Sequence, residues 1–401
     1  MDYDEEKIEL LLERSIATIY PSKDALRELL RSGKKLRIYV GIDPTATYVH
    51  LGHSTNYFIL RRFHELGHKI IVLIGDFTAM IGDPSDKTSM RVKLTATEVQ
   101  KNLETFKDQI GKIIHFSDKK NPVEFELNSK WLAKLTFENA VELASHFTVQ
   151  QMLERDAFQK RLQEEKPLYV HEFFYPLMQG YDSVALSADI ELGGTDQTFN
   201  MLAGRTLVRA YQNREKLVIT TTLLENPVTG EKLMSKSLGT GIALNEAPAD
   251  MYGKAMRLPD EALIQLFVDC TDLDYSEIDR IRGALEEGEN PRNIKMRLAW
   301  EIVRIYHGEK IADATQKDFI AKFQKKAVPD NVTEYTVLST DEIADLFVKE
   351  KIVSSKTEFR RFLENNAITN LETNTKINYP DEFITVTYKV GSHTFVRLII
   401  G

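Results

Sequence analysis

The chain has 401 residues, of which 42% are hydrophobic and 28% are charged, and its formal net charge is −8. This is the composition of a globular protein with a sizeable core. The negative charge argues against a protein that coats DNA but leaves RNA binding through local basic patches open. The single cysteine, Cys270, excludes a disulfide framework and a cysteine zinc site within one chain. The acidic start "MDYDEEKIELLLERS" is unlike a signal peptide, and no stretch reaches the ~18 apolar residues of a membrane span. We therefore expect a cytoplasmic protein without a membrane partner.

The first half of the chain predicts a Rossmann-type parallel sheet. Residues 5–32 have helical periodicity that ends at Gly33. Four later runs are apolar enough for strands buried on both faces: 36–42, 69–76, 187–194 and 216–224. A helical pattern connects the first two of these runs, as expected for a parallel crossover.

The second half of the chain predicts smaller modules. Residues 248–326 are periodic at helical spacing, and residues 327–339, with Pro329, have the pattern of a linker. Two short helical patterns followed by strand-like pieces predict a small α+β domain over 340–401. The expected fold is thus an α/β domain over 1–247, an all-α domain over 248–326 and a small α+β domain.

The segment "DPTATYVHLGHSTN" places His50, Gly52 and His53 at the start of the helix that follows the first apolar strand. Ligands bind at such strand ends in doubly wound sheets, and helix N-termini favour phosphates through free N–H groups and the helix dipole. The motif therefore predicts a phosphate site. Taken alone, it also fits a helix start with two partly exposed imidazoles.

Three further segments carry polar residues in loops. "EKLMSKSLGTGI" (231–242) contains a lysine suited to a leaving phosphate. "GGTDQ" (193–197) has glycines for close backbone approach and an aspartate suited to a ribose diol. "IGDPSDKTSMR" (81–91) carries two cations. Each alone also fits an ordinary turn or surface loop.

In this order, the four segments resemble those of the class I aminoacyl-tRNA synthetases. Together with "YPLMQGYD" (175–182), they are similar to the bacterial-type tyrosyl-tRNA synthetases from about residue 30 to 245, and more loosely to the C-terminus. The resemblance implies attack of the tyrosine carboxylate on the α-phosphorus of ATP, brought as its Mg²⁺ complex, and then transfer of the tyrosyl group to tRNA(Tyr). No resident metal or prosthetic group is implied.

The resemblance also implies roles at the ATP end. His50 and His53 donate hydrogen bonds to ATP, Gly52 keeps a side chain off the adenine, and Thr45 lies near the γ-phosphate. The side chains that hold the departing pyrophosphate are Lys87, Arg91, Ser235 and Lys236. Asp43 lies near the amino-acid carboxylate or the ribose, and Gly194 and Asp196 lie near the ribose hydroxyls. The chain departs from the family pattern at Leu233, where the first lysine of the loop is expected; Lys232 lies one place early.

At the tyrosine end, Tyr175, Gln179 and Asp182 fall at i, i+4 and i+7, on one face of a helix. On the resemblance, Asp182 and Tyr39 contact the substrate phenol, and Asn128 orients Asp182. Tyr175, Gln179 and Asp83 surround the substrate ammonium, and Gln197 contacts the substrate or the adenylate. Phenylalanine has no hydroxyl, so the buried Asp182 and Tyr39 would lose a partner, and this would explain its rejection by tyrosyl-tRNA synthetases.

The implied domains are a catalytic domain with a dimerisation insertion over 1–247, a helical anticodon-binding-type domain over 248–326, and a C-terminal RNA-binding domain over 340–401. A homodimer interface is implied near 146–162. Three alternatives stay open: a tryptophanyl relative, a small nucleotidyltransferase, and a non-catalytic RNA-binding paralogue. Asp182 with Tyr39 favours a phenol over an indole.

Overall fold

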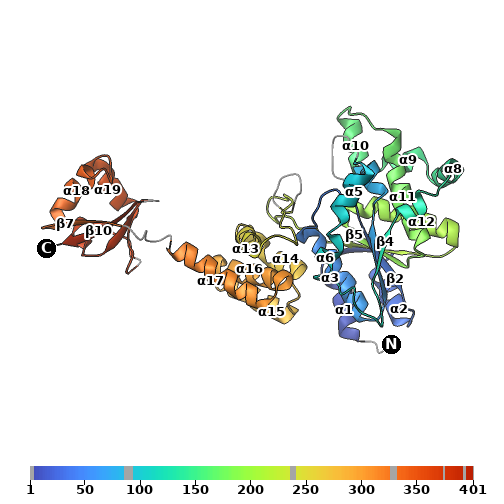
Figure 1. Cartoon of the computed structure of the whole chain (residues 1–401), viewed down its shortest axis with the longest axis horizontal. Coiled ribbons are helices and arrows are strands. Elements are labelled where there is room, and N and C mark those ends of the chain that lie inside the picture. The colour runs from blue at the N-terminus through green and yellow to red at the C-terminus, as the bar shows by residue number, and fades with distance from the viewer. Residues whose placement is uncertain are drawn as a thin grey trace. The chain divides into compact units, whose positions relative to one another are not determined.

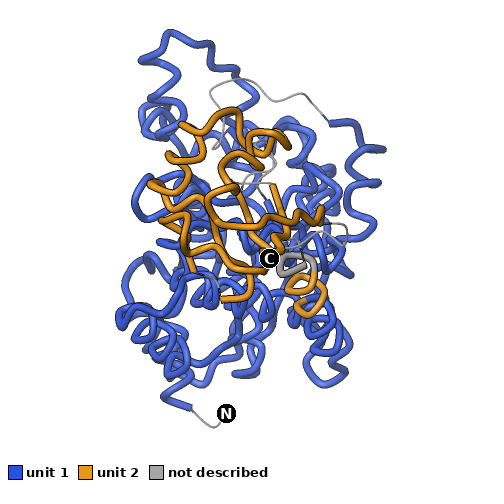
Figure 2. Tube along the Cα trace, turned by 90° about the vertical axis from the view of Figure 1, so that its left-hand side faces the viewer, with its two compact units in different colours: residues 1–315 blue, residues 316–401 orange. Residues whose placement is uncertain are grey.

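The computed structural model describes residues 4–84, 94–234, 241–325, 332–373, 375–391 and 394–400. The chain divides into two compact units, residues 1–315 and 316–401, which are coloured separately in Figure 2. The first unit contains a six-stranded sheet in the order β1-β6-β5-β2-β3-β4, and the second a four-stranded sheet in the order β7-β10-β9-β8.

The six-stranded sheet is mainly parallel (Figure 1). Its strands are β1 (Ile16–Tyr20), β2 (Arg37–Ile42), β3 (Lys69–Ile74), β4 (Glu124–Leu127), β5 (Ile190–Gly194) and β6 (Leu217–Thr221). β2 lies beside β3 and β5, in parallel register with both, as in Val40 opposite Leu192. The crossovers from β2 and β5 run in opposite directions along the sheet, so the switch point lies between these two strands.

The edge strand β1 corrects the expectation for residues 5–32. That segment forms α1 (Glu5–Glu13), β1 and α2 (Lys23–Arg31), and β1 pairs antiparallel with β6, with Ile19 opposite Ile219. The β-branched run "IATIY" gains a partner only when β6 is present, because β6 is about two hundred residues away in the sequence. Local helical periodicity therefore could not reveal this strand.

Helices cover both faces of the six-stranded sheet (Figure 1). α3 (Leu51–Glu65) is the crossover between β2 and β3, and α12 (Thr198–Gln212) is the crossover between β5 and β6. α11 (Phe174–Ala185) packs along α12. The remaining helices before β5 are α4 (Thr78–Ile81), α5 (Ala96–Leu103), α6 (Phe106–Ile110), α7 (Ser129–Leu132), α8 (Phe137–Ser145), α9 (Val149–Leu153), α10 (Asp156–Gln163) and the short η2 (Val170–Phe173).

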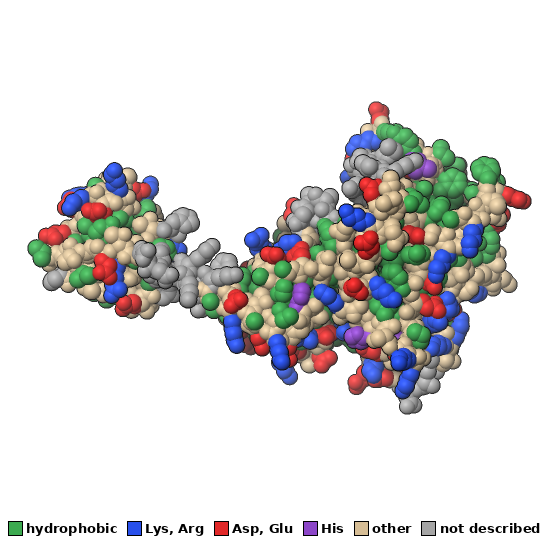
Figure 3. Space-filling view, viewed as in Figure 1, with side chains coloured by type: hydrophobic (Ala, Val, Ile, Leu, Met, Phe, Trp, Pro, Cys, Tyr) green, Lys and Arg blue, Asp and Glu red, His purple; other side chains and the backbone are tan. Residues whose placement is uncertain are grey.

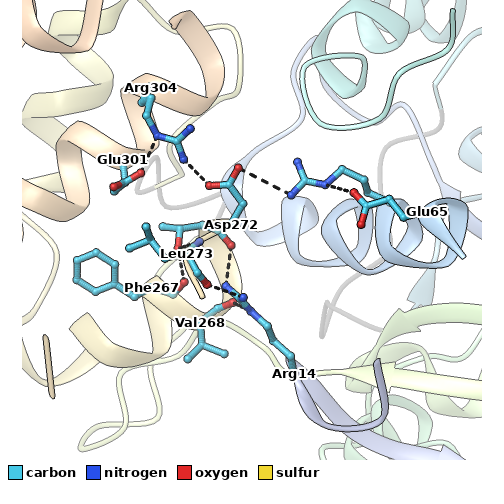
Figure 4. Close-up of polar contacts among 10 residues, drawn as sticks. Arg14, Glu65, Phe267, Val268, Asp272, Leu273, Glu301 and Arg304 are labelled. Carbon is cyan, nitrogen blue, oxygen red and sulfur yellow. Dashed lines mark hydrogen bonds and ion pairs between the residues drawn. The ribbon is translucent and has the colours of Figure 1, made fainter. Parts of the chain in front are cut away.

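A helical region completes the first unit. Its elements are α13 (Pro248–Ala255), η4 (Asp260–Ala262), α14 (Leu263–Cys270), α15 (Tyr275–Glu286), α16 (Pro291–His307) and the start of α17 (Glu309–Lys325). Arg14, after α1, donates from Nη1 and Nη2 to the carbonyls of Leu273 and Thr271 at 2.7 and 2.9 Å, at the C-terminal end of α14 (Figure 4). A cation stabilises a helix C-terminus, where carbonyls lack helical partners.

Ion pairs also join the helical region to α3. Asp272 pairs with Arg304 of α16 and lies 3.9 Å from Nη2 of Arg61 on α3, while Arg304 also pairs with Glu301 at 2.7 Å (Figure 4). The end of α3 opposite to His50 is thus anchored on the helices that follow the sheet.

The second unit has its own core. Its elements are β7 (Thr333–Val337), α18 (Ile343–Lys349), α19 (Lys356–Glu364), β8 (Ile368–Asn370), β9 (Thr387–Val390) and β10 (Thr394–Ile400). Phe347, Phe359, Phe383 and Tyr388 pack together in this core. The expected linker over 327–339 is wrong for residues 333–337, because these pair parallel to β10 and become a sheet strand.

Candidate active site

The predicted site residues gather at the carboxyl ends of β2 and β5, beside the switch point. The loop after β2 carries Asp43 and Thr45, and β5 ends at Gly194 before the short helix η3 (Thr195–Gln197). α11 contributes a face of polar residues, and α3 begins nearby at Leu51. This is the position where open α/β sheets bind ligands.

The two histidines cap α3. His50 is the N-cap residue, and its Nδ1 accepts a hydrogen bond from Gly52 N at 3.1 Å; His53 Nδ1 in turn accepts from His50 N at 3.3 Å. The ring centroids are 3.8 Å apart. Because Nδ1 is the acceptor in both rings, a neutral imidazole carries its proton on Nε2 and can donate from there. A Cβ on Gly52 would lie 3.0 Å from the His50 ring, so the cap needs glycine at this position.

The two flanks of the "SKS" loop lie at this helix start. Leu51 N donates to Ile242 O at 2.9 Å, and Leu244 N donates to Val49 O at 2.8 Å. On the other flank, the Met234 Cβ lies 3.3 Å from the position that a Gly52 Cβ would occupy. The predicted phosphate-binding residues Ser235, Lys236, Lys87 and Arg91 lie outside the described residues.

Asp43 is held by two hydroxyls. Thr78 Oγ1 donates to its Oδ1 at 2.7 Å, and the Tyr175 hydroxyl donates to its Oδ2 at 2.9 Å. Thr45 N donates to the Asp43 carbonyl at 2.8 Å, which folds the loop tightly after β2. A Cβ on Gly75 would lie 1.9 Å from Asp43 Oδ1, so the glycine that follows β3 makes room for this carboxylate.

Asp182 lies buried on α11 between two donors. Trp131 Nε1 donates to Oδ1 at 2.7 Å, and Asn128 Nδ2 lies 3.2 Å from Oδ2. Burial raises the pKa of Asp182 well above its ordinary value, while the two hydrogen bonds act in the opposite direction. Asn128 also accepts from Phe77 N at 3.0 Å, so its side-chain oxygen and nitrogen are both engaged and its amide is fixed.

Tyr39 lies on β2, fully buried, with its hydroxyl 2.7 Å from Ser183 Oγ. Burial raises the pKa of the Tyr39 hydroxyl well above its ordinary value, and the carboxylates of Glu191 and Asp182 act in the same direction, so this phenol keeps its proton. Ser183 follows Asp182 on α11, and Trp131 packs on the apolar cluster that contains Tyr39. Tyr39 and Asp182 are thus both buried and close enough for the Asp182 charge to act on the Tyr39 hydroxyl.

The remaining predicted tyrosine contacts are joined by hydrogen bonds. Asp83 accepts from Gln197 Nε2 at 2.8 Å and from Arg155 Nη2 at 2.6 Å. Gln179 Nε2 donates to Glu191 Oε1 at 3.1 Å. The first network joins the segment after α4, the N-cap of α10 and η3, and the second joins α11 to β5.

The residues predicted to contact the ribose, Gly194 and Asp196, lie at and just after the end of β5. A Cβ on Gly194 would lie 2.5 Å from Asp196 Oδ1, so a side chain at this position would displace the Asp196 carboxylate. Lys232, which lies one place early for the family loop, has its Nζ 3.9 Å from Asp196 Oδ2. Leu233 N donates to Leu224 O at 2.8 Å, which pairs this backbone with the segment after β6.

Five residues of this neighbourhood were missed in the sequence: Trp131, Arg155, Ser183, Glu191 and Lys216. Trp131 lies three residues after Asn128 on the short helix α7, a spacing that could have pointed to it. Arg155 and Lys216 give no such local signal, because their acidic partners lie 72 and 25 residues away.

The described part of the chain contains no group of three or more His, Cys, Asp or Glu side chains arranged to hold a metal ion. Within the same residues, no helix is long and apolar enough to cross a membrane.

Comparison with known proteins identifies the family. The model described as tRNA synthetases class I (W and Y) matches residues 31–324. The tyrosine–tRNA ligase of Moorella thermoacetica is 44% identical over 364 residues, covering 89% of this chain and 87% of the relative. That of Carboxydothermus hydrogenoformans is 41% identical and covers 100% and 99%, respectively.

Solved structures share the fold. The C-terminally truncated mitochondrial tyrosyl-tRNA synthetase of Aspergillus nidulans has a TM-score of 0.66 at 24% identity, covering 79% of this chain and 94% of that chain. The Archaeoglobus fulgidus enzyme complexed with L-tyrosine has a TM-score of 0.60 at 20% identity, covering 78% and 99%, respectively. The resemblance seen in the sequence is thereby confirmed, and the chain belongs to the tyrosyl-tRNA synthetases of the class I aminoacyl-tRNA synthetase family.

Proposed function

We propose that this tyrosine–tRNA ligase activates tyrosine at the β2–β5 switch point, with the phenol at the buried end and ATP at the start of α3. The observation that carries the assignment is the buried Asp182, which accepts from the half-buried Trp131 and whose charge acts on the Tyr39 hydroxyl. Asp182 accepts a hydrogen bond from the substrate phenol, and Tyr39 contacts the same oxygen. A ring without this hydroxyl offers no hydrogen bond to either group, so phenylalanine loses this part of the binding energy.

The substrate ammonium is surrounded by Tyr175, Gln179 and Asp83, and Gln197 supports it from η3. Asp83 already holds a favourable position, since Arg155 and Gln197 fix both of its oxygens. The amino-acid carboxylate is thereby turned toward the start of α3. It attacks the α-phosphorus of ATP, the bond to the pyrophosphate oxygen breaks, and tyrosyl-adenylate forms.

The ATP end relies on charge stabilisation. The Nε2–H groups of His50 and His53 and the N-terminus of α3 bind phosphate oxygens, and Thr45 lies near the γ-phosphate. Gly52 leaves space for the adenine, and the ribose lies against Gly194 and Asp196, with Asp43 between ribose and amino acid. ATP enters as its Mg²⁺ complex. Ser235, Lys236, Lys87 and Arg91 receive the pyrophosphate. The tyrosyl group then passes to a ribose hydroxyl of the terminal adenosine of tRNA(Tyr), and AMP leaves.

The other regions are assigned to tRNA and dimer contacts. Residues 248–326 are assigned to the anticodon region and the C-terminal α+β module to tRNA binding, where α19 exposes Lys356, Arg360 and Arg361. Exposed apolar side chains on α8–α10 support a homodimer interface that includes 146–162 (Figure 3). The buried free thiol of Cys270 fits a reducing cytoplasm.

The test is tyrosine-dependent exchange of labelled pyrophosphate into ATP, with tryptophan and phenylalanine in parallel. Exchange with tyrosine alone, greatly reduced in His53→Ala, supports both the substrate and the site. Exchange with tryptophan instead moves the substrate to the sister enzyme. Folded protein that binds tRNA but exchanges with none of the three contradicts the proposal.

A further inference from the structure

A buried ion pair lies directly behind the proposed phenol pocket. Lys216 immediately precedes β6, Glu191 lies on β5, and the Lys216 side chain is fully buried. Lys216 Nζ pairs with Glu191 Oε2 and also lies 2.8 Å from Ser183 Oγ and 3.1 Å from the Met201 carbonyl. An ammonium has three N–H donors, and these three acceptors use all of them.

The surrounding helices make room for this pair. α12 has glycine at 204, and a Cβ there would lie 2.6 Å from Lys216 Nζ and 2.8 Å from Ser183 Oγ. Burying two charges is expensive, and an apolar pair of similar volume is often as stable or more so. Stability of the sheet therefore gives no sufficient reason for a lysine and a glutamate at this position.

The distances favour one direction for the hydrogens in this network. Ser183 Oγ accepts from Lys216 and has a single hydrogen, for which the nearest acceptor is the Tyr39 oxygen at 2.7 Å, whereas Glu191 Oε2 lies at 3.2 Å. If Ser183 donates to Tyr39, the Tyr39 hydrogen is available for the substrate oxygen. The substrate phenol can then give its own hydrogen to Asp182. In this chain of hydrogen bonds, Ser183, Tyr39 and the phenol each donate to one acceptor. The opposite direction would require the phenol to donate one hydrogen to two oxygens.

We propose that Lys216 and Glu191 position the tyrosine-recognition groups: Lys216, through Ser183, makes the Tyr39 hydroxyl a donor to the substrate phenol, and Glu191 holds the Gln179 amide. The Glu191–Gln179 bond is 3.1 Å and uses the carboxylate oxygen that does not pair with Lys216. A fixed cation at one end and Asp182 at the other polarise the series in one direction. This inference rests on the proposed function, since it requires a phenol between Tyr39 and Asp182.

The first experiment compares Ser183→Ala, Tyr39→Phe and the double variant by pyrophosphate exchange. Ser183→Ala should lower kcat/KM for tyrosine about tenfold, the value of one well-placed hydrogen bond, with the KM for ATP unchanged. In the Tyr39→Phe background, the same substitution should change kcat/KM less than about twofold, because the group through which it acts is gone. Thr220→Val, which removes another buried hydroxyl of the sheet, is the matched control and should leave both constants unchanged.

The second experiment replaces the charged pair by the apolar pair Lys216→Met with Glu191→Met. The thermal unfolding midpoint should be kept or raised, while the KM for tyrosine rises about tenfold and the KM for ATP stays constant. An equal effect of Ser183→Ala in both backgrounds, or an apolar pair with wild-type tyrosine KM, would overturn the inference. Absence of exchange in the unmodified enzyme would instead overturn the proposed function.

Discussion

The Arg155 guanidinium lies 2.6 Å from Asp83, Nη2 to Oδ1, and both side chains are buried. Arg155 is the N-cap residue of α10, while Asp83 follows α4, so the pair ties the helices inserted after β4 to the proposed ammonium site. The carboxylate that would attract the substrate ammonium is thus already oriented by the protein.

Arg155→Met should weaken both stability and tyrosine binding. Breaking one side of a buried ion pair costs about 3 kcal/mol or more in the free energy of unfolding, and Asp83 would lose its fixed orientation. Arg155→Lys keeps the charge and should show a smaller loss on both counts. Denaturant unfolding and the KM for tyrosine measure the two effects. Wild-type values for Arg155→Met would contradict this role of the pair.

The pH dependence of kcat/KM for tyrosine should follow the ionisation of Asp182. Its carboxyl has a raised pKa because it is buried, so it becomes protonated, as pH falls, at a higher pH than an ordinary aspartate. Since the ionised form is the better acceptor for the phenol, kcat/KM for tyrosine should decrease toward acid through that pKa. Asp182→Asn should have a low kcat/KM from which this acidic limb is missing. A limb of unchanged size in the variant would assign the titration to another group.

His50 combines helix capping with a proposed contact to ATP, and two substitutions separate these roles. Asparagine is a good N-cap, so His50→Asn should keep the unfolding free energy, whereas His50→Ala should lose about 1 kcal/mol. Both should reduce pyrophosphate exchange about a hundredfold, because both lack the Nε2–H donor. Wild-type pyrophosphate exchange in His50→Asn would show that His50 caps the helix but does not contact ATP.

The apolar surface on the inserted helices should mediate dimerisation. Phe137 is 84% exposed and Val170 is 76% exposed, values that are costly for a permanently hydrated surface. Phe137→Asp should shift the mass measured by sedimentation equilibrium from dimer to monomer. Val228→Asp, at an exposed apolar residue on a distant loop, is the control and should remain dimeric. A monomeric unmodified protein would contradict the interface.

Charge on α19 should affect tRNA but not adenylate formation. Arg360 is exposed on this helix of the second unit. In the full-length chain, Arg360→Glu should raise the KM for tRNA(Tyr) in aminoacylation, since it replaces attraction to phosphates by repulsion. Pyrophosphate exchange without tRNA should be unchanged. An unaltered KM for tRNA would argue against contact at this helix.

The sequence predicts those features that depend on local pattern. Apolar runs located β2, β3, β5 and β6, and turn glycines located the loops at their ends. β1 escaped prediction because its stability comes from β6, which is remote in the chain. The family motifs gave the residues that the proposed function places against the ligands, whereas the buried Lys216 and Glu191 could not be predicted from the sequence. A lysine before an apolar strand is indistinguishable, by pattern, from a solvated one.

One helix faces the whole length of the amino acid on the proposed assignment. From Tyr175 to Asp182, α11 rises seven residues, about 10 Å at 1.5 Å per residue. The backbone hydrogen bonds of the helix therefore fix the distance between the proposed ammonium contact and the proposed phenol contact. The backbones of α11 and α12 approach closely at Gly180 and Gly204, so α12 restrains the position of α11. A longer or shorter substrate would then require new side chains at positions 175 and 182, because a movement of α11 would displace both contacts together.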